Sequence, residues 1–126
     1  IAWYTGKPGG AGVYYGRVPR DGHAAPRAVA LVSGTSLQTG HPGIAPLEGG
    51  GALVALDVDD AGARVIRLVR VGPDGDIAAA RTVPGSGGGS YPQVAALDGG
   101  GALVAWRQPD GESSRVRVVR VAGTGD

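Results

Sequence analysis

His41 and Tyr91 stand fifty residues apart, and each is followed directly by a proline and a short apolar segment. An imidazole and a phenol combine an aromatic face with hydrogen-bonding groups, which suits a polar ligand such as a sugar. The candidate ligand-binding residues are these two together with Tyr4, Lys7 and Arg107, from loops expected at the same end of the fold. A second interpretation, which the residues alone favour, is that His41 and Tyr91 only cover the start of a strand.

Three aspartates, Asp57, Asp59 and Asp60, precede Gly62 with a spacing faintly similar to that of a calcium loop. Alternating carboxylates converge on a hard cation in such loops. The spacing departs from that of an EF-hand, and the corresponding segment 107–111 keeps only one carboxylate. We therefore expect a solvated hairpin turn here and no metal site.

Trp3 and Trp106 occupy equivalent positions in an internal repeat, and an exposed indole would offer a flat face for stacking on a sugar. Packing between neighbouring sheets is the interpretation that we favour. Arg17, Arg70 and Arg120 also recur in every repeat unit. Because a residue repeated in each unit usually serves the fold, we do not take these arginines as catalytic.

No motif in the sequence specifies a reaction. The glycine-rich segments 49–51 and 85–89 lack a following helix and the Lys-Ser/Thr pair of a P-loop, so they predict turns. The chain contains no cysteine, which rules out a thiolate nucleophile, a thiolate metal site and disulfides. We therefore assign no catalytic residue and no cofactor.

The charge pattern argues against two classes of partner. Twelve basic and eleven acidic residues are spread along the 126-residue chain, so we expect neither nucleic acid nor an anionic membrane as partner. No apolar run approaches the roughly 18 residues of a membrane-spanning helix. The chain has no methionine and begins inside an apolar segment, so we expect Ile1 to follow a processing site or an earlier part of the chain.

An internal repeat organises the chain. Residues 41–76 align without a gap on 91–126, and 17 of the 36 aligned pairs are identical. Residues 1–23 fit the same pattern in phase with 54–76, which indicates a unit of 50 to 53 residues. A repeat of this length is typical of architectures in which one supersecondary unit recurs.

Within one unit we expect four short strands separated by turns that contain Gly, Asp or Pro, near residues 43–47, 52–58, 64–71 and 77–83. The two central segments carry apolar residues on both faces, as a sheet covered on both sides requires. No segment shows apolar residues at helical spacing over three turns. The sequence therefore predicts an all-β protein in which residues 44–83 form an antiparallel four-stranded sheet.

Four antiparallel strands in about 50 residues match the size of a β-propeller blade, and a ring holds roughly four to eight blades. We predict a single β-propeller segment over residues 1–126, with a partial blade at 1–40, a full blade at 41–90 and a partial blade at 91–126. A two-sheet sandwich also uses short strands, but it does not explain the period. Because about two and a half blades cannot close a ring, we expect exposed apolar faces and either self-association or further chain that completes the propeller.

Several segments carry a family resemblance. They are Val13-Tyr14-Tyr15-Gly16-Arg17 followed by Asp21-Gly22, then His41-Pro42, and finally Tyr91-Pro92-Gln93-Val94-Ala95. In the order of its strand and turn segments the sequence resembles the bacterial sialidase-like (neuraminidase, BNR-repeat) β-propellers. The family's Asp-box, Ser-x-Asp-x-Gly-x-Thr-Trp, is degenerate here, because Asp21-Gly22 has neither the flanking Ser/Thr nor the closing aromatic residue. The arginine triad, Tyr/Glu pair and Asp acid/base of sialidases are matched by no residue of this chain.

The resemblance implies a non-catalytic binding or interaction scaffold with carbohydrate as its ligand. The alternative is part of a sialidase-like glycoside hydrolase whose catalytic residues lie outside this chain. A third hypothesis is that the main property of the chain is self-assembly, in which several copies complete a ring. The resemblance and the bias toward Ala, Gly, Arg, Val and Asp lead us to expect a bacterial protein that is secreted or lies at the cell surface.

Overall fold

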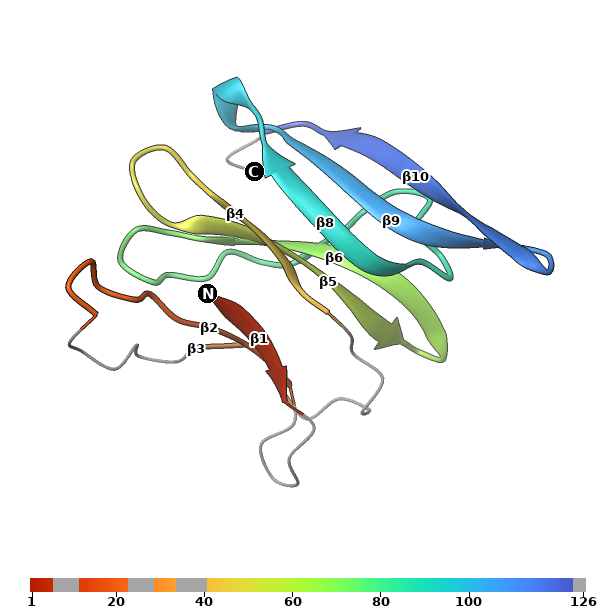
Figure 1. Cartoon of the computed structure of the whole chain (residues 1–126), viewed down its shortest axis with the longest axis horizontal. Helices are drawn as coiled ribbons and strands as arrows, with labels where there is room; N and C mark the ends of the chain where they lie inside the picture. Colours follow the sequence, from red (N-terminus) through yellow and green to blue (C-terminus); the bar gives the residue numbers. More distant parts are fainter. Residues whose placement is uncertain (6–11, 23–28, 34–40, 124–126) are drawn as a thin grey trace.

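The computed structural model describes residues 1–5, 12–22, 29–33 and 41–123. These residues form three open antiparallel sheets that pack face to face in chain order (Figure 1). We call them the N-terminal, middle and C-terminal sheets. The middle sheet lies between the other two.

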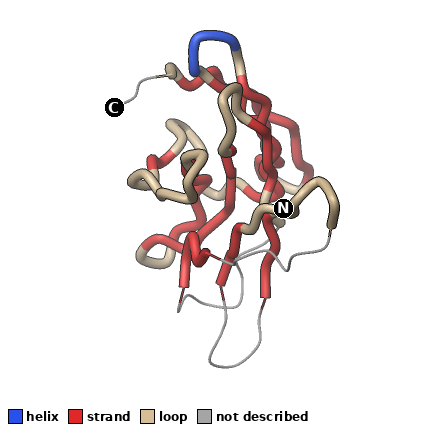
Figure 2. Tube along the Cα trace, turned by 90° about the vertical axis from the view of Figure 1, so that its left-hand side faces the viewer, coloured by secondary structure: helices blue, strands red, loops and turns tan. Residues whose placement is uncertain are grey.

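The N-terminal sheet has the order β1-β2-β3, with β1 (Ala2–Thr5), β2 (Gly12–Tyr15) and β3 (Val29–Ser33). The middle sheet has the order β4-β5-β6-β7, with β4 (Gly43–Pro46), β5 (Ala52–Asp60), β6 (Ala63–Val71) and β7 (Arg81–Thr82). The C-terminal sheet has the order β10-β9-β8, with β8 (Ser90–Ala96), β9 (Ala102–Asp110) and β10 (Ser113–Val121). A single 3-10 turn, η1 (Asp98–Gly100), joins β8 to β9 at one end of the strands (Figure 2). Within the described ranges no helix is long and apolar enough to cross a membrane.

The prediction of an all-β chain is confirmed for the described residues, and so is an antiparallel four-stranded sheet within residues 41–90. The long strands β5 and β6 pair over their whole length, as the sequence predicted. The outer strand differs from the continuous one expected at 77–83. Ile77 lies opposite Val71 and Arg81 opposite Leu68, so the register shifts by one residue between these pairs and the ladder is interrupted.

The two Gly-Gly-Gly segments form turns with equivalent hydrogen bonds, between β4 and β5 and between β8 and β9. In both copies the second glycine donates its N–H to a leucine carbonyl three residues earlier, at 3.1 Å for Gly50 and 3.2 Å for Gly100. Gly49 and Gly99 adopt φ angles of 82° and 81°, which glycine reaches without steric cost. The third glycine differs, since φ is 84° at Gly51 and −77° at Gly101, so the two copies share their hydrogen bonds but not their whole backbone conformation.

The middle sheet is covered on both faces, one by each neighbour. Toward the N-terminal sheet the buried cluster consists of Val13, Tyr15, Ala52, Val54, Leu56, Val58, Val69 and Val71. Toward the C-terminal sheet it consists of Leu53, Ala55, Ile66, Leu68, Val83, Ala102, Val104, Trp106 and Val121. Because successive strand residues point to opposite faces, the uninterrupted apolar run at 52–56 contributes to both clusters.

Candidate ligand-binding site

His41 and Tyr91, at equivalent positions of the repeat, stack on each other. Their ring centroids are 4.6 Å apart, and the ring planes differ by 26°. His41 is exposed, and Tyr91 keeps 50% of its surface exposed. The pair forms an accessible aromatic surface where β8 and the residues preceding β4 meet.

A close backbone contact between β4 and β8 brings the two rings together (Figure 1). A Cβ atom on Gly43 would lie 2.6 Å from the carbonyl oxygen of Pro92 and 2.9 Å from Cα of Gln93. Because these distances leave no room for a side chain, glycine at this position lets the backbones of two sheets touch. Gln93 holds the position of Gly43 in the next repeat unit, so this glycine is specific to the contact.

Tyr91 adopts an unusual backbone conformation. Its φ angle is 53°, in the left-handed region that residues other than glycine seldom occupy. The pairing of β8 with β9 shifts register between Ser90 and Gln93, so Tyr91 lies in a β-bulge. Bulges redirect side chains, and this one accompanies the stacking of the Tyr91 ring on His41.

The carboxylate of Asp57 supports this bulge. Asp57 is only 1% exposed, and its Oδ2 accepts a hydrogen bond of 3.2 Å from the backbone N–H of Tyr91. The same oxygen lies 3.7 Å from Nη1 of Arg64. A buried carboxylate needs such partners to offset the loss of water. Asp57 thereby links β5 of the middle sheet to β8 of the C-terminal sheet, next to the aromatic pair.

The expected solvated hairpin turn lies at Ala61-Gly62, and Asp59 and Asp60 are exposed beside it at the end of β5, whereas the expectation is wrong for the buried Asp57. Asp59 accepts a 2.8 Å hydrogen bond from the turn backbone, and Asp60 forms an exposed ion pair at 3.1 Å. Asp57 instead continues β5, on the same buried face as Ala55. Strand alternation through 53, 55 and 57 was the signal in the sequence that could have identified it.

Of the remaining candidate residues, the structure describes the side chain of Arg107 and not those of Tyr4 and Lys7. Arg107 is exposed on β9, and its Cα lies opposite that of Ser90, the residue before Tyr91. Tyr4 belongs to β1 of the N-terminal sheet, and its side chain falls outside what the structure describes. Lys7 also lies outside the described residues. The structure therefore brings together His41 and Tyr91 and adds Asp57, whereas Arg107 lies on the opposite face of β9 from the buried Trp106 and is not part of the pair.

Trp106 is a packing residue, as the sequence favoured. It is 1% exposed within the cluster between the middle and C-terminal sheets. Its Nε1 donates a 2.7 Å hydrogen bond to Oε1 of Gln108, and the guanidinium of Arg117 lies 5.7 Å from its ring centroid. Trp3 is half-buried and stacks on Tyr14 at a centroid distance of 5.9 Å.

In the segment 84–89, most of which the sequence predicted to form turns, Ser86 and Gly89 are buried and the other four residues are exposed. Ser86 is 1% exposed; its Oγ donates to the carbonyl of Val83 at 2.6 Å and accepts from the N–H of Ile66 at 3.0 Å. A Cβ on Gly89 would lie 2.6 Å from the Trp106 ring. Glycine at position 89 therefore leaves the space that the buried Trp106 ring occupies.

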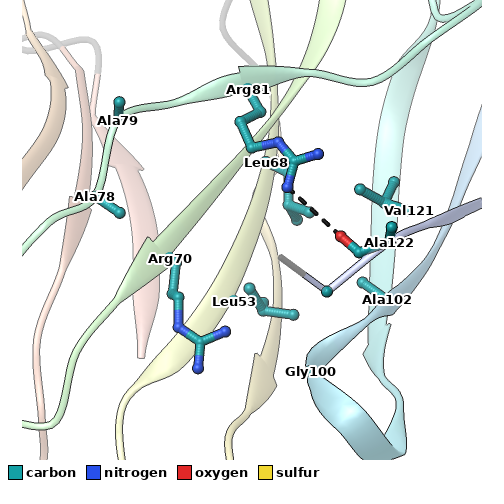
Figure 3. Close-up of a pocket in the computed structure, with 11 residues that line it drawn as sticks. Leu53, Leu68, Arg70, Ala78, Ala79, Arg81, Gly100, Ala102, Val121 and Ala122 are labelled. Atoms are coloured by element: carbon teal, nitrogen blue, oxygen red, sulfur yellow. Dashed lines mark hydrogen bonds between the residues drawn. The ribbon is translucent and has the colours of Figure 1, made fainter. Parts of the chain in front are cut away.

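A groove of about 160 Å³ lies between the middle and C-terminal sheets, toward the end of the strands that carries η1 (Figure 3). Its apolar lining includes Leu53, Leu68, Ala78, Ala102 and Val121. Arg70 and Arg81 also line it, and Nη1 of Arg81 donates a 3.5 Å hydrogen bond to the carbonyl of Ala122. The lining suits an apolar group with a negative charge. Sequence analysis singled out Arg70 alone among these residues, and only as one that recurs in each repeat unit. The groove itself could not be predicted, because its lining residues come from strands far apart in the chain.

No family model, curated protein or solved structure matches this chain. In the described part of the chain, no three His, Asp or Glu side chains gather as a metal-binding group. The assignment of function therefore depends on the chemistry of the site residues themselves.

Proposed function

We propose that this chain is a non-catalytic carbohydrate-binding scaffold, built from consecutive blades of a sialidase-like β-propeller, with His41 and Tyr91 at its binding surface. The observation that carries the proposal is the exposed stack of these two rings at 4.6 Å. Two aromatic residues at equivalent repeat positions meet in solvent, where an apolar contact between them alone would gain little.

The chemistry of the pair suits a sugar. A pyranose ring presents a face of C–H groups surrounded by hydroxyls, so it needs an apolar platform together with hydrogen-bonding groups. The half-exposed Tyr91 supplies ring surface and a phenol O–H, and His41 supplies imidazole nitrogens. Arg107 takes no part in this pair, because it is opposite Val116 on the outer face of the C-terminal sheet, turned away from the middle sheet.

The site is also preorganised, which favours binding. The hydrogen bond from the Tyr91 N–H to Asp57 and the contact of Gly43 with Pro92 hold the bulge in place without a ligand. Interactions formed before binding reduce the ordering cost that a ligand would otherwise have to offset. Irregular backbone held by its surroundings is common at functional sites.

The propeller part of the proposal is supported by how the sheets stack. Each sheet packs on the next through equivalent faces, and the inner strands β4 and β8 touch at Gly43. Neighbouring blades of a propeller pack face to face with their innermost strands at the central channel. The aromatic pair would then lie at a mouth of that channel, where ligands of concave scaffolds bind.

The proposal is tested by titrating the chain with monosaccharides of different chemistry: neutral hexoses, N-acetylhexosamines and N-acetylneuraminic acid. We expect at least one class to bind, and binding to fall at least about tenfold in His41→Ala and in Tyr91→Ala, which corresponds to roughly 1.4 kcal/mol. Saturation-transfer NMR and calorimetry provide the measurement. Thermal unfolding of each variant shows whether the fold persists.

Tyr14→Ala is the matched control, because Tyr14 also belongs to a partly exposed aromatic stack, on the N-terminal sheet. It should bind the sugar like the parent chain. If no sugar class binds the parent, or if the His41 and Tyr91 variants bind as well as Tyr14→Ala, the carbohydrate assignment is wrong.

A further inference from the structure

The outer face of the C-terminal sheet, the face turned away from the middle sheet, exposes apolar side chains. Val116 is 73% exposed, Val118 59% and Leu103 39%. The register places Leu103 opposite Arg120, Ala105 opposite Val118 and Arg107 opposite Val116, so these residues share one face. Within the described residues, nothing packs on it.

The internal repeat shows what kind of surface covers such a face. The positions of Leu103, Val116 and Val118 correspond, fifty residues earlier, to Leu53, Ile66 and Leu68 of the middle sheet. There the three residues are 4%, 0% and 7% exposed, because the C-terminal sheet covers them. The same face is therefore an interface in one sheet and bare in the next.

The residues that cover the middle sheet are the inward ones of the C-terminal sheet, Ala102, Val104 and Trp106. On the N-terminal sheet the residue in the repeat position of Trp106 is Trp3. Val13 and Tyr15 of that sheet pack on the middle sheet, whereas Trp3 and Tyr14, which lie opposite each other on β1 and β2, point the other way. Trp3 and Tyr14 stack and stay partly exposed.

We propose that the outer face of the C-terminal sheet binds the outer face of the N-terminal sheet of a second copy of this chain. The chain carries both halves of an interface that it already forms twice internally. An unrelated partner would have to imitate the Trp3 face, whereas a second copy supplies it. Apolar patches of several hundred Å² rarely stay bare on soluble proteins, which provides the driving force.

This contact is head to tail, since different faces of the two copies meet. The described residues of two copies form six sheets, three in each, which falls within the roughly four to eight blades of known propellers. A head-to-tail contact either closes into a ring or continues into a filament.

Two variants block the two halves separately. Val118→Asp places a charge on the outer face of the C-terminal sheet, at a residue 59% exposed, so the fold should persist. Ala30→Arg does the same on the N-terminal sheet, because Ala30 is exposed and lies opposite Tyr14 on β3. Val18→Asp, at a 54% exposed residue in the loop after β2, is the matched control.

Sedimentation velocity over a range of concentrations provides the measurement, with circular dichroism as the check on folding. We expect the parent and Val18→Asp to associate. Val118→Asp and Ala30→Arg should each raise the Kd of self-association by at least about tenfold. Mixing the two variants leaves one intact contact, so a one-to-one complex of both should form and grow no further.

Three results would overturn the proposal. The first is a parent chain that stays monomeric at every concentration. The second is association that Val118→Asp abolishes and Ala30→Arg leaves intact, since that pattern means two C-terminal sheets face each other. The third is a mixture in which folded variants form no complex. Sugar binding enters none of these measurements, so they are independent of the carbohydrate proposal.

Discussion

The Asp57 carboxylate accepts a 3.2 Å hydrogen bond from the backbone N–H of Tyr91, thirty-four residues away in the chain. This bond joins two sheets at the point where the aromatic pair is exposed. Because it uses the backbone of Tyr91, the phenol ring remains available to a ligand. The same carboxylate lies 3.7 Å from Arg64, so one buried charge serves both sheet packing and the candidate site.

Replacing Asp57 with Asn should lower the free energy of unfolding by roughly 1–3 kcal/mol, as expected when a buried polar group loses its charged partner. The amide oxygen can still accept from the Tyr91 N–H, but Arg64 loses its counter-charge. Arg64 is 31% exposed and keeps some water, which limits the loss. Asp60→Asn is the control: its pair with Arg67 is exposed, so the change should stay below about 1 kcal/mol. Urea unfolding measures both, and equal effects would contradict the role of Asp57.

Gly43→Ala should destabilise the chain by about 1–3 kcal/mol or more, because the new methyl group meets backbone atoms of Pro92 at 2.6 Å and the strands must separate. The His41 imidazole protons should then lose the ring-current shift caused by Tyr91, which NMR detects. Gly87→Ala is the matched control, since a Cβ there meets nothing within 4 Å. A Gly43→Ala variant as stable as Gly87→Ala would show that β4 and β8 do not touch.

The sequence was sufficient to predict the local elements of this fold, because turn residues and strand alternation are local signals. The repeat located β4, β5 and β6 to within a few residues. It placed His41 and Tyr91 at equivalent positions, but it could not show that they stack. That contact depends on the Gly43 backbone approach and on the bulge at Tyr91, and both arise between segments far apart in the chain. Asp57 was missed because its charge suggested a turn, although its strand continued.

The hairpin turn at Ala61-Gly62 offers a position where the chain can be stabilised. Both residues have positive φ, 53° and 83°, as in a type I′ turn, which prefers Asn-Gly. Ala61→Asn should therefore raise stability by about 0.5–1 kcal/mol, since Asn tolerates the left-handed region better than Ala. Thermal unfolding measures the gain. In the equivalent turn the left-handed residue is Gly111, so Glu112→Asn should bring no gain, and a similar gain there would contradict this explanation.

The two tryptophans should report two different environments, since the chain contains only Trp3 and Trp106. Trp106 is 1% exposed, so a Trp3→Phe variant should emit at short wavelength and resist quenching by iodide. A Trp106→Phe variant, which leaves only Trp3, should emit at longer wavelength and be quenched readily.

Stability should follow the same division. Trp106→Ala opens a cavity between the middle and C-terminal sheets and removes the hydrogen bond to Gln108, so a loss of about 3–5 kcal/mol is expected. Trp3→Ala affects a half-buried residue on an outer face and should cost less than half as much. Trp106→Phe keeps most of the apolar contact, so its loss of stability should lie between those of Trp106→Ala and Trp3→Ala. If Trp3→Ala proved the more destabilising change in dilute solution, the N-terminal sheet and not the interface around Trp106 would hold the stack together.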